Sequence, residues 1–124
     1  MQYLCMVFLD ENVLDSLPPA EKQALIDESL AYDDVLKQKG HFVSASALEP
    51  VRSGAAVRVR NGKALVTDGP FAETHEQIGG FILIEAADLN EAIRIASALP
   101  VPRLGGIEVR PLRTITRSAE RAAC

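Results

Sequence analysis

The sequence predicts an α+β protein with a ferredoxin-like β-α-β-β-α-β core and an inserted β-hairpin. The segments 3–9 and 81–84 are apolar at successive positions, as in strands that are covered on both faces. The segments 19–39 and 88–99 carry apolar residues at helical spacing. Between the two helices, the Asn-Gly pair at 61–62 is the strongest short signal for a tight hairpin turn.

The first part of the chain is predicted to form a strand over 2–9 and a helix over 19–39. Turn formers at 10–12 end the strand. Gly40 follows the helix as a stop, as a left-handed cap residue does. Three side chains of the helix fall on one apolar stripe, which would pack against the sheet: Leu25, Tyr32 and Leu36.

The middle of the chain is predicted to form three strands. Residues 41–48 make the second core strand, which a Glu-Pro pair ends. Residues 55–60 alternate between apolar and charged side chains, and the turn at 61–62 returns the chain along 63–67. A type I′ turn needs positive φ at both central positions, which Asn and Gly adopt readily.

The last third supplies a core strand, the second helix and a final strand. Residues 79–86 are apolar on both faces. Asp88 and Glu91 form a D-x-x-E capping box at the start of the helix, and two prolines after Leu99 end it. Residues 107–112 alternate again and form the last strand.

The two helices can cover only one face of the predicted sheet. The strands at 3–9 and 81–84 are nevertheless apolar on both faces, and the chain has no further element for the second face. Two sheets packed face to face would remove those side chains from water. We therefore expect a homodimer.

Length and composition fit one folded domain. The chain has 124 residues, of which 48% are hydrophobic and 24% charged, and its net charge of −4 argues against nucleic-acid binding. No apolar stretch is long enough to span a bilayer, so we expect no membrane partner. No signal peptide is evident, and Cys5 and Cys124 suggest no disulfide framework. We expect a cytoplasmic protein with one domain over 1–113 and a flexible tail over 114–124.

The polar loop over 68–78 is the main candidate site. It holds three carboxylates and an imidazole within nine positions: Asp68, Glu73, His75 and Glu76. Groups of this kind support proton transfer when crowding and burial move their pKa values apart, and we expect them to line a cavity beside the sheet. The alternative is structural, with Asp68 bonding the backbone of the turn that follows it and the two glutamates solvated.

His41, at the start of the second core strand, is the further candidate. It would join the 68–78 loop in one pocket, or else serve as a hydrogen-bonded histidine at a strand end. No His and acid spacing matches a metal site, and no phosphate loop or dinucleotide motif occurs, so we expect neither metal nor cofactor. Gly79-Gly80 precede a strand rather than a helix, which favours close backbone packing or a bulge.

Three segments resemble the YCII-related family, and its DGPF branch in particular. They are Val66–Phe81 with its Asp-Gly-Pro-Phe motif, Asp88–Ala92 and Ile107–Pro111. Their order and spacing are also similar, and the resemblance covers residues 1–113. The DGPF branch usually has Lys where this chain has His75. The resemblance implies a dimeric α+β barrel, in agreement with the two-faced strands.

The resemblance implies little about chemistry, because the family has largely lacked an assigned reaction. Some relatives are encoded beside, or fused to, extracytoplasmic-function sigma factors. One interpretation is an enzyme with an acid–base pocket that acts on a small molecule. The second is a non-catalytic ligand-binding or regulatory module associated with a sigma factor. The third is a dimeric protein whose motif serves only folding.

Overall fold

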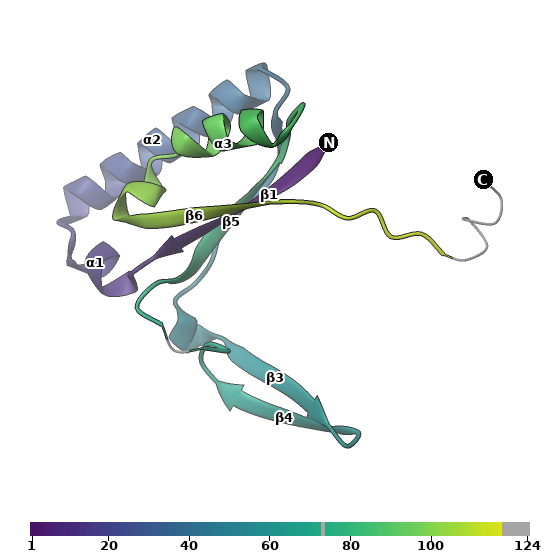
Figure 1. Cartoon of the computed structure of the whole chain (residues 1–124). Helices are drawn as coiled ribbons and strands as arrows, with labels where there is room; N and C mark the ends of the chain where they lie inside the picture. The colour runs from purple at the N-terminus through teal and green to yellow at the C-terminus, as the bar shows by residue number, and fades with distance from the viewer. Residues whose placement is uncertain (73, 118–124) are drawn as a thin grey trace.

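A four-stranded antiparallel sheet with helices on one face forms the body of the protein (Figure 1). The computed structural model describes residues 1–72 and 74–117. The strands are β1 (Gln2–Leu9), β2 (Phe42–Ala47), β5 (Gln77–Glu85) and β6 (Gly105–Pro111), in the order β2-β5-β1-β6. The helices are α1 (Glu11–Ser16), α2 (Pro19–Gln38) and α3 (Leu89–Ser97). This arrangement fits the predicted ferredoxin-like fold.

The core lies between the helices and one face of the sheet. Alternate residues of β1 point toward the helices, and the β1–β5 register pairs Tyr3 with Ile84 and Cys5 with Ile82 on that face. Leu36 of α2 and several residues of α3 complete the cluster, including Ala92, Ile95 and Ala96. Within the described residues, no helix is long and apolar enough to cross a membrane.

The helix boundaries agree closely with the sequence prediction. Helix α2 ends at Gln38, directly before Lys39 and the expected stop at Gly40. At the start of α3, the Asp88 carboxylate accepts a hydrogen bond from the Glu91 N–H at 2.8 Å, as the capping box predicts. The Glu91 carboxylate in turn accepts from the Ala87 N–H at 2.9 Å, one residue before the cap.

Helix α1 is a difference from the prediction, because the chain at Asp10 was expected only to turn. The Asp10 side chain accepts a hydrogen bond from the Asn12 N–H at 2.9 Å and thereby caps the helix that follows. The same short acidic side chain favours turns and helix N-termini, so the residue type alone does not separate the two. Strands β5 and β6 also begin two residues earlier than predicted, at Gln77 and Gly105.

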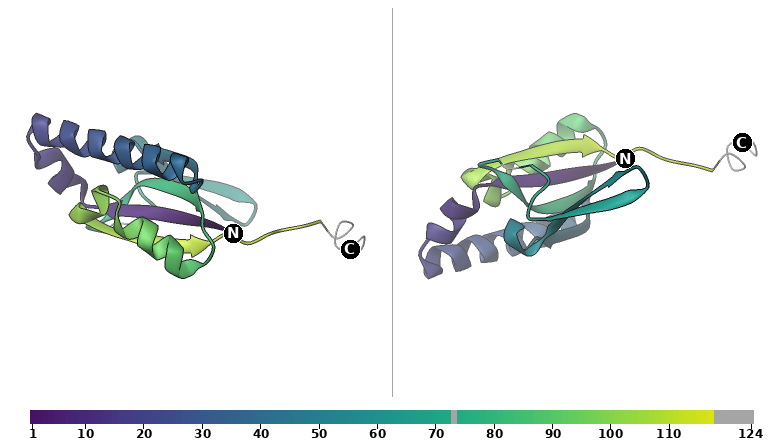
Figure 2. Two further views of the ribbon diagram at one scale, coloured as in Figure 1. Left: turned by 90° about the horizontal axis from the view of Figure 1, so that it is seen from above. Right: turned by 90° about the horizontal axis from the view of Figure 1, so that it is seen from below.

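The hairpin is a separate two-stranded sheet of β3 (Ala55–Arg60) and β4 (Lys63–Asp68). Asn61 has φ of 51° and Gly62 has φ of 74°, so the predicted turn with two positive φ values is confirmed. The hairpin extends from the body on the side of the sheet opposite α2 and α3 (Figures 1 and 2).

The second face of the main sheet is apolar along its middle and lacks a covering helix in the described residues. The register places Met6 beside Phe81, Leu4 beside Leu83 and Phe8 beside Ile78 on this face. We call these six side chains the open face. Polar residues of the two edge strands border it, namely Ser44, Ser46, Glu108 and Arg110.

Gly105, at the start of β6, is required by a close approach of two strands. A Cβ atom at this position would collide with the backbone carbonyl oxygen of Phe8 on β1. At Gly106 a Cβ would meet nothing within 4 Å, because it would point over the open face. We expect Gly105→Ala to lower the free energy of unfolding by about 1–3 kcal/mol, because the β1–β6 ladder must shift.

The matched control is Gly106→Ala, which should change the free energy of unfolding by less than about 0.5 kcal/mol. Urea denaturation followed by far-UV circular dichroism measures both variants. Equal stability of the two variants would contradict the close β1–β6 contact.

Candidate functional site

A cleft of about 490 Å³ opens between α2 and the β2 edge of the sheet. Small residues form its floor, namely Ala45, Ala47, Gly79 and Gly80. Apolar side chains of α2 form its wall, namely Leu25, Ile26 and Leu30, and residues 99–102 close one end. We call this space the helix cleft. Its size and lining are those of a small-molecule site.

The floor of the helix cleft depends on an irregularity in β5. The pairing of β1 and β5 shifts between Val7 and Phe8, opposite Gly79. The Gly79 carbonyl oxygen accepts a hydrogen bond from the Leu48 N–H at 2.9 Å, which holds the end of β2 against it. The predicted bulge or close packing at Gly79-Gly80 is therefore confirmed. Because these residues are small, α2 has space rather than side chains beneath it.

Helix α2 carries two apolar stripes with different surroundings. On the first, Leu36 is buried in the core and the Tyr32 hydroxyl donates a hydrogen bond to the Ile95 carbonyl oxygen at 2.8 Å. On the second, Ile26 is 51% exposed and Leu30 is 58% exposed, and both line the helix cleft. Removing such apolar side chains from water is favourable in free energy. The second stripe thus offers an apolar contact surface to a ligand.

Asp33 is the carboxylate with the most distinct electrostatics in the helix cleft. Burial among apolar neighbours raises its pKa, Lys37 on the next turn lowers it and the adjacent Asp34 raises it again. A carboxyl that keeps its proton to a higher pH can donate a hydrogen bond or a proton to a bound molecule. Other polar residues line the cleft at intervals: Asp15, Lys22 and Ser29.

The residues of the predicted loop site lie elsewhere. Asp68 ends β4, and His75 and Glu76 precede β5; all three are exposed. None of them lines the helix cleft or the second cavity, of about 480 Å³, at the base of the hairpin. Glu73 lies outside the described residues. The roles that the sequence suggested for these side chains stay predictions.

The loop itself is held by its own backbone contacts. The Thr74 hydroxyl donates a hydrogen bond to the Glu76 carbonyl oxygen. The Gln77 side-chain amide donates to the Thr74 and Ala72 carbonyl oxygens at 2.9 and 3.3 Å. These local bonds set the path of the loop as it enters β5.

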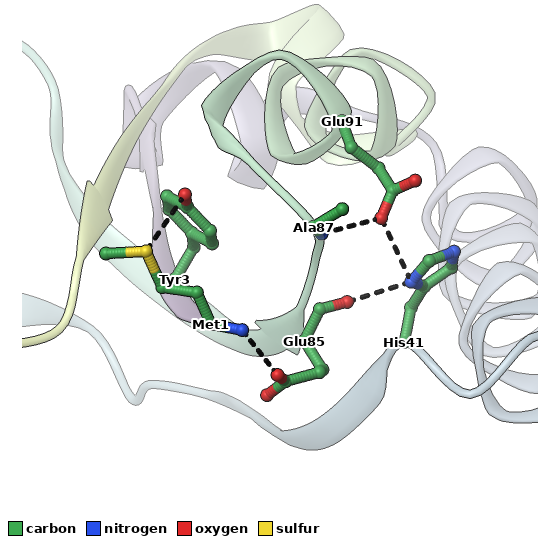
Figure 3. A network of polar contacts seen from close by, with 6 residues as sticks. All are labelled: Met1, Tyr3, His41, Glu85, Ala87 and Glu91. Atoms are coloured by element: carbon green, nitrogen blue, oxygen red, sulfur yellow. Dashed lines mark hydrogen bonds and ion pairs between the residues drawn. The ribbon is translucent and has the colours of Figure 1, made fainter.

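His41 lies beside Glu85 at the end of β5, whereas the loop precedes the start of this strand; Figure 3 shows the contacts of His41. Its Nδ1–H donates a hydrogen bond to the Glu85 carbonyl oxygen at 2.8 Å, and Glu91 Oε1 lies 3.9 Å from the same nitrogen. A carbonyl oxygen only accepts, so Nδ1 carries the proton. The length of β5, about 27 Å at its usual rise, separates the two places. The structure therefore does not bring His41 into one pocket with the loop.

The network around His41 joins the ends of several elements. The Met1 amino group contacts the Glu85 carboxylate, and the Tyr3 hydroxyl reaches the Met1 sulfur at 3.4 Å (Figure 3). The Glu85 N–H donates to the His41 carbonyl oxygen at 2.7 Å. These contacts fit the structural alternative for His41, a hydrogen-bonded histidine at a strand end.

Metal-ligating side chains and cysteines do not form a further candidate site within the described residues. Within the described residues no cluster of three or more His, Cys, Asp or Glu side chains is placed to hold a metal ion. Cys5 is fully buried, and burial raises the pKa of its thiol to about 11, so it is protonated at neutral pH. Cys124 lies outside the described residues.

The helix cleft is not among the sites predicted from the sequence, although the sequence contains part of its pattern. Ile26, Leu30 and Asp33 recur at helical spacing beside the stripe assigned to the core. A second apolar stripe on one helix indicates a second contact surface. The opposing floor comes from residues 45–48 and 79–82, which no local pattern relates to α2.

The raised pKa of Asp33 predicts a pH-dependent cost to stability. The folded state holds the Asp33 proton more tightly than the unfolded state, so the carboxyl favours folding at acidic pH. That contribution is lost as the pH rises through the folded-state pKa. We expect Asp33→Asn to raise the melting temperature at pH 7 and to bring a smaller gain near pH 3.

Asp34→Asn is the matched control, since Asp34 is exposed on the same turn and lies 3.9 Å from Lys37. Because it removes both the contact with Lys37 and a charge that raises the pKa of Asp33, it should change the melting temperature at pH 7 less than Asp33→Asn does. Differential scanning calorimetry at both pH values measures the two variants. A destabilised Asp33→Asn at pH 7 would contradict the desolvation of this carboxyl.

Sequence comparisons place the fold in a known family. A family model described as the YCII-related domain matches residues 1–116. An uncharacterised protein of Rhizobium meliloti (strain 1021) is 35% identical over 114 residues, which cover 90% of this chain and 92% of that protein. The family match spans nearly the whole chain, including the hairpin, the loop and the helix cleft. The chain belongs to the YCII-related family.

Proposed function

We propose that this protein binds a small, largely apolar molecule in the helix cleft. The single observation that carries the proposal is the cleft itself, about 490 Å³ in volume and lined mainly by aliphatic side chains. Ligand sites of proteins usually measure about 300–1,000 Å³ and combine apolar walls with a few polar groups. The exposed side chains of Ile26 and Leu30 would be removed from water by such a ligand.

The chemistry of the site centres on Asp33. Its raised pKa supports a role as hydrogen-bond donor or proton-transfer group toward a polar atom of the ligand. The proposed function is therefore acid–base chemistry on a small molecule, with Asp33 in the helix cleft as the first residue to test. The loop residues Asp68, Glu73, His75 and Glu76, and His41, remain candidates from the sequence alone.

Recovery of the bound molecule distinguishes the two functional classes. A ligand that is converted on incubation supports the enzyme. A ligand that is recovered unchanged supports the non-catalytic ligand-binding or regulatory module, for which association with a sigma factor is the expectation from the family resemblance. The Asp-Gly-Pro-Phe segment at 68–71 supports placing the chain in the DGPF branch of the family.

The protein is further proposed to act as a homodimer through the open face. Leu4, Met6, Phe8, Phe81 and Leu83 are half-buried there, and Ile78 is 39% exposed. A contiguous apolar strip at the centre of a sheet is typical of a surface that another sheet covers. The polar edge residues would form the rim of that interface.

Filling the helix cleft should remove ligand binding. Ala47 is exposed, lies on the cleft floor at the edge strand β2 and can accept a larger side chain without displacing the core. We expect Ala47→Phe to weaken binding of the neutral fluorescent probe N-phenyl-1-naphthylamine at least tenfold, because the ring would occupy the cleft. Fluorescence titration measures the dissociation constant.

Ala31→Phe is the control for this substitution, because Ala31 is an exposed residue of α2 outside the cleft lining. It should bind the probe within about twofold of the wild type. If Ala47→Phe binds as tightly as Ala31→Phe, or if the wild type binds no probe, the helix cleft is not the ligand site.

The proposed homodimer predicts the mass of the protein in solution and a substitution that should dissociate it. Light scattering coupled to gel filtration should give about twice 13.4 kDa for the wild type. Leu83→Lys should shift the protein to a monomer, because the ammonium group would be buried between two sheets. Ala31→Lys, on the helix side, should remain a dimer. A wild-type monomer at micromolar concentration would exclude the proposed homodimer.

A further inference from the structure

The hairpin β3–β4 is exposed along almost its whole length. Eleven of its twelve strand residues are exposed, and only Ala56 is partly covered. A two-stranded antiparallel sheet is at best marginally stable in water without a further layer. Yet the pairing is regular over six residue pairs, from Ala55–Asp68 to Arg60–Lys63. A surface that covers one side of the hairpin would account for this regular arm.

The two sides of the hairpin differ in chemistry. The register places Val57 beside Val66 and Val59 beside Ala64 on one side, which also carries Ala55 and its partner Asp68 at the base of the hairpin. We call this side the valine face; Val59 is 62% exposed and Val66 is 64% exposed. The other side carries the cations, and its Arg58 guanidinium lies 3.8 Å from the centre of the Phe71 ring. Among the residues that the structure describes, no contact covers the four apolar side chains Val57, Val59, Ala64 and Val66 as Phe71 covers Arg58.

The hairpin and the open face lie on the same side of the molecule. In Figure 1 helices α2 and α3 lie above the main sheet and the hairpin lies below it, and the view from below in Figure 2 has the hairpin in front of the sheet. Two unpartnered apolar surfaces thus border one region. A single partner that covers the open face would also lie beside the hairpin.

The size of the open face favours participation of the hairpin in the same interface. Stable interfaces bury about 800 Å² and 20–30 residues on each partner. The open face offers six apolar side chains, five of them already half-buried within the sheet. The exposed residues of the hairpin would bring the buried surface toward the usual size.

Charge favours a second copy of this chain as the partner. The hairpin over 55–68 has three cations and one acid, a net charge of +2 within a chain of net −4, so the rest of the chain carries −6. The three cations lie on the side opposite the valine face, so this charge difference would attract the arm to an acidic body at long range and would not form the apolar contact itself. In a two-fold dimer each arm would reach the body of the other copy, so every such contact would occur twice.

We propose that β3–β4 is a dimerisation arm whose valine face packs against the second copy of the chain. This inference rests on the proposed homodimer and identifies the hairpin as a further element that contacts the partner. Contact with the partner would order the arm. The valine face would add to the interface the buried apolar area that the open face alone does not supply.

Two neighbouring residues of β4 provide a charge-matched test. Val66 belongs to the valine face and Thr67 points to the opposite side. We expect Val66→Lys to raise the dimer dissociation constant at least tenfold in sedimentation equilibrium, because it places an ammonium group in the apolar contact. Thr67→Lys, which adds the same charge, should leave the constant within about threefold of the wild type.

The possible results distinguish failure of the arm proposal from failure of the homodimer proposal. A wild type that is monomeric overturns both proposals. A dimeric wild type whose dissociation constant is equally insensitive to Val66→Lys and Thr67→Lys overturns the arm and leaves the homodimer intact.

Amide hydrogen exchange tests the same arm without altering it. The hairpin amides should exchange at least tenfold faster in the Leu83→Lys monomer than in the wild-type dimer, because the covering layer is lost. Equal exchange in a monomer and a dimer would overturn the arm even if Val66→Lys failed to fold.

Discussion

Both faces of the central strand pair β1–β5 are apolar, and the helices of one chain cover only one of them. The rest of the structure follows from this constraint. On the covered face, Tyr3, Cys5, Ile82 and Ile84 pack beneath α2 and α3 and hold the sheet to the helices. On the other face, apolar side chains remain at the surface. A further layer of protein that covered them would remove them from water. The hairpin extends toward that side, where a further layer would meet both surfaces (Figure 1).

The covered face is not filled uniformly, and the helix cleft is the result. Near α3 the helical layer is closely packed, with Ala92 and Ala96 fully or almost fully buried. Toward β2, the floor consists of alanines and glycines while α2 continues above it. A cavity lined by aliphatic groups lowers stability, because its lining lacks packing partners. A ligand that fills it would restore those contacts and stabilise the fold.

The elements with local signals were predicted well, and those set by long-range placement were not. The Asn61-Gly62 turn and the Asp88 cap depend on neighbouring residues alone, so the sequence was sufficient. Helix α1 was missed because an Asp begins both turns and helices. The helix cleft needs residues of β2 and β5 beneath α2, a placement that periodicity does not specify. His41 and the loop both adjoin strand ends, but β5 runs between them.

The two candidate sites differ in what they need to perform acid–base chemistry. Such chemistry near neutral pH requires a group that is partly withdrawn from water. Asp33 is half-buried within one chain, beside the apolar residues of the helix cleft, and this burial raises its pKa. Asp68, His75 and Glu76 are exposed in the single chain. The loop joins the base of the hairpin to β5. A second copy that packs against the hairpin would therefore lie close to the loop. If the loop residues have a catalytic role, the proposed dimer would provide the burial that they lack in the single chain, whereas Asp33 is half-buried without it.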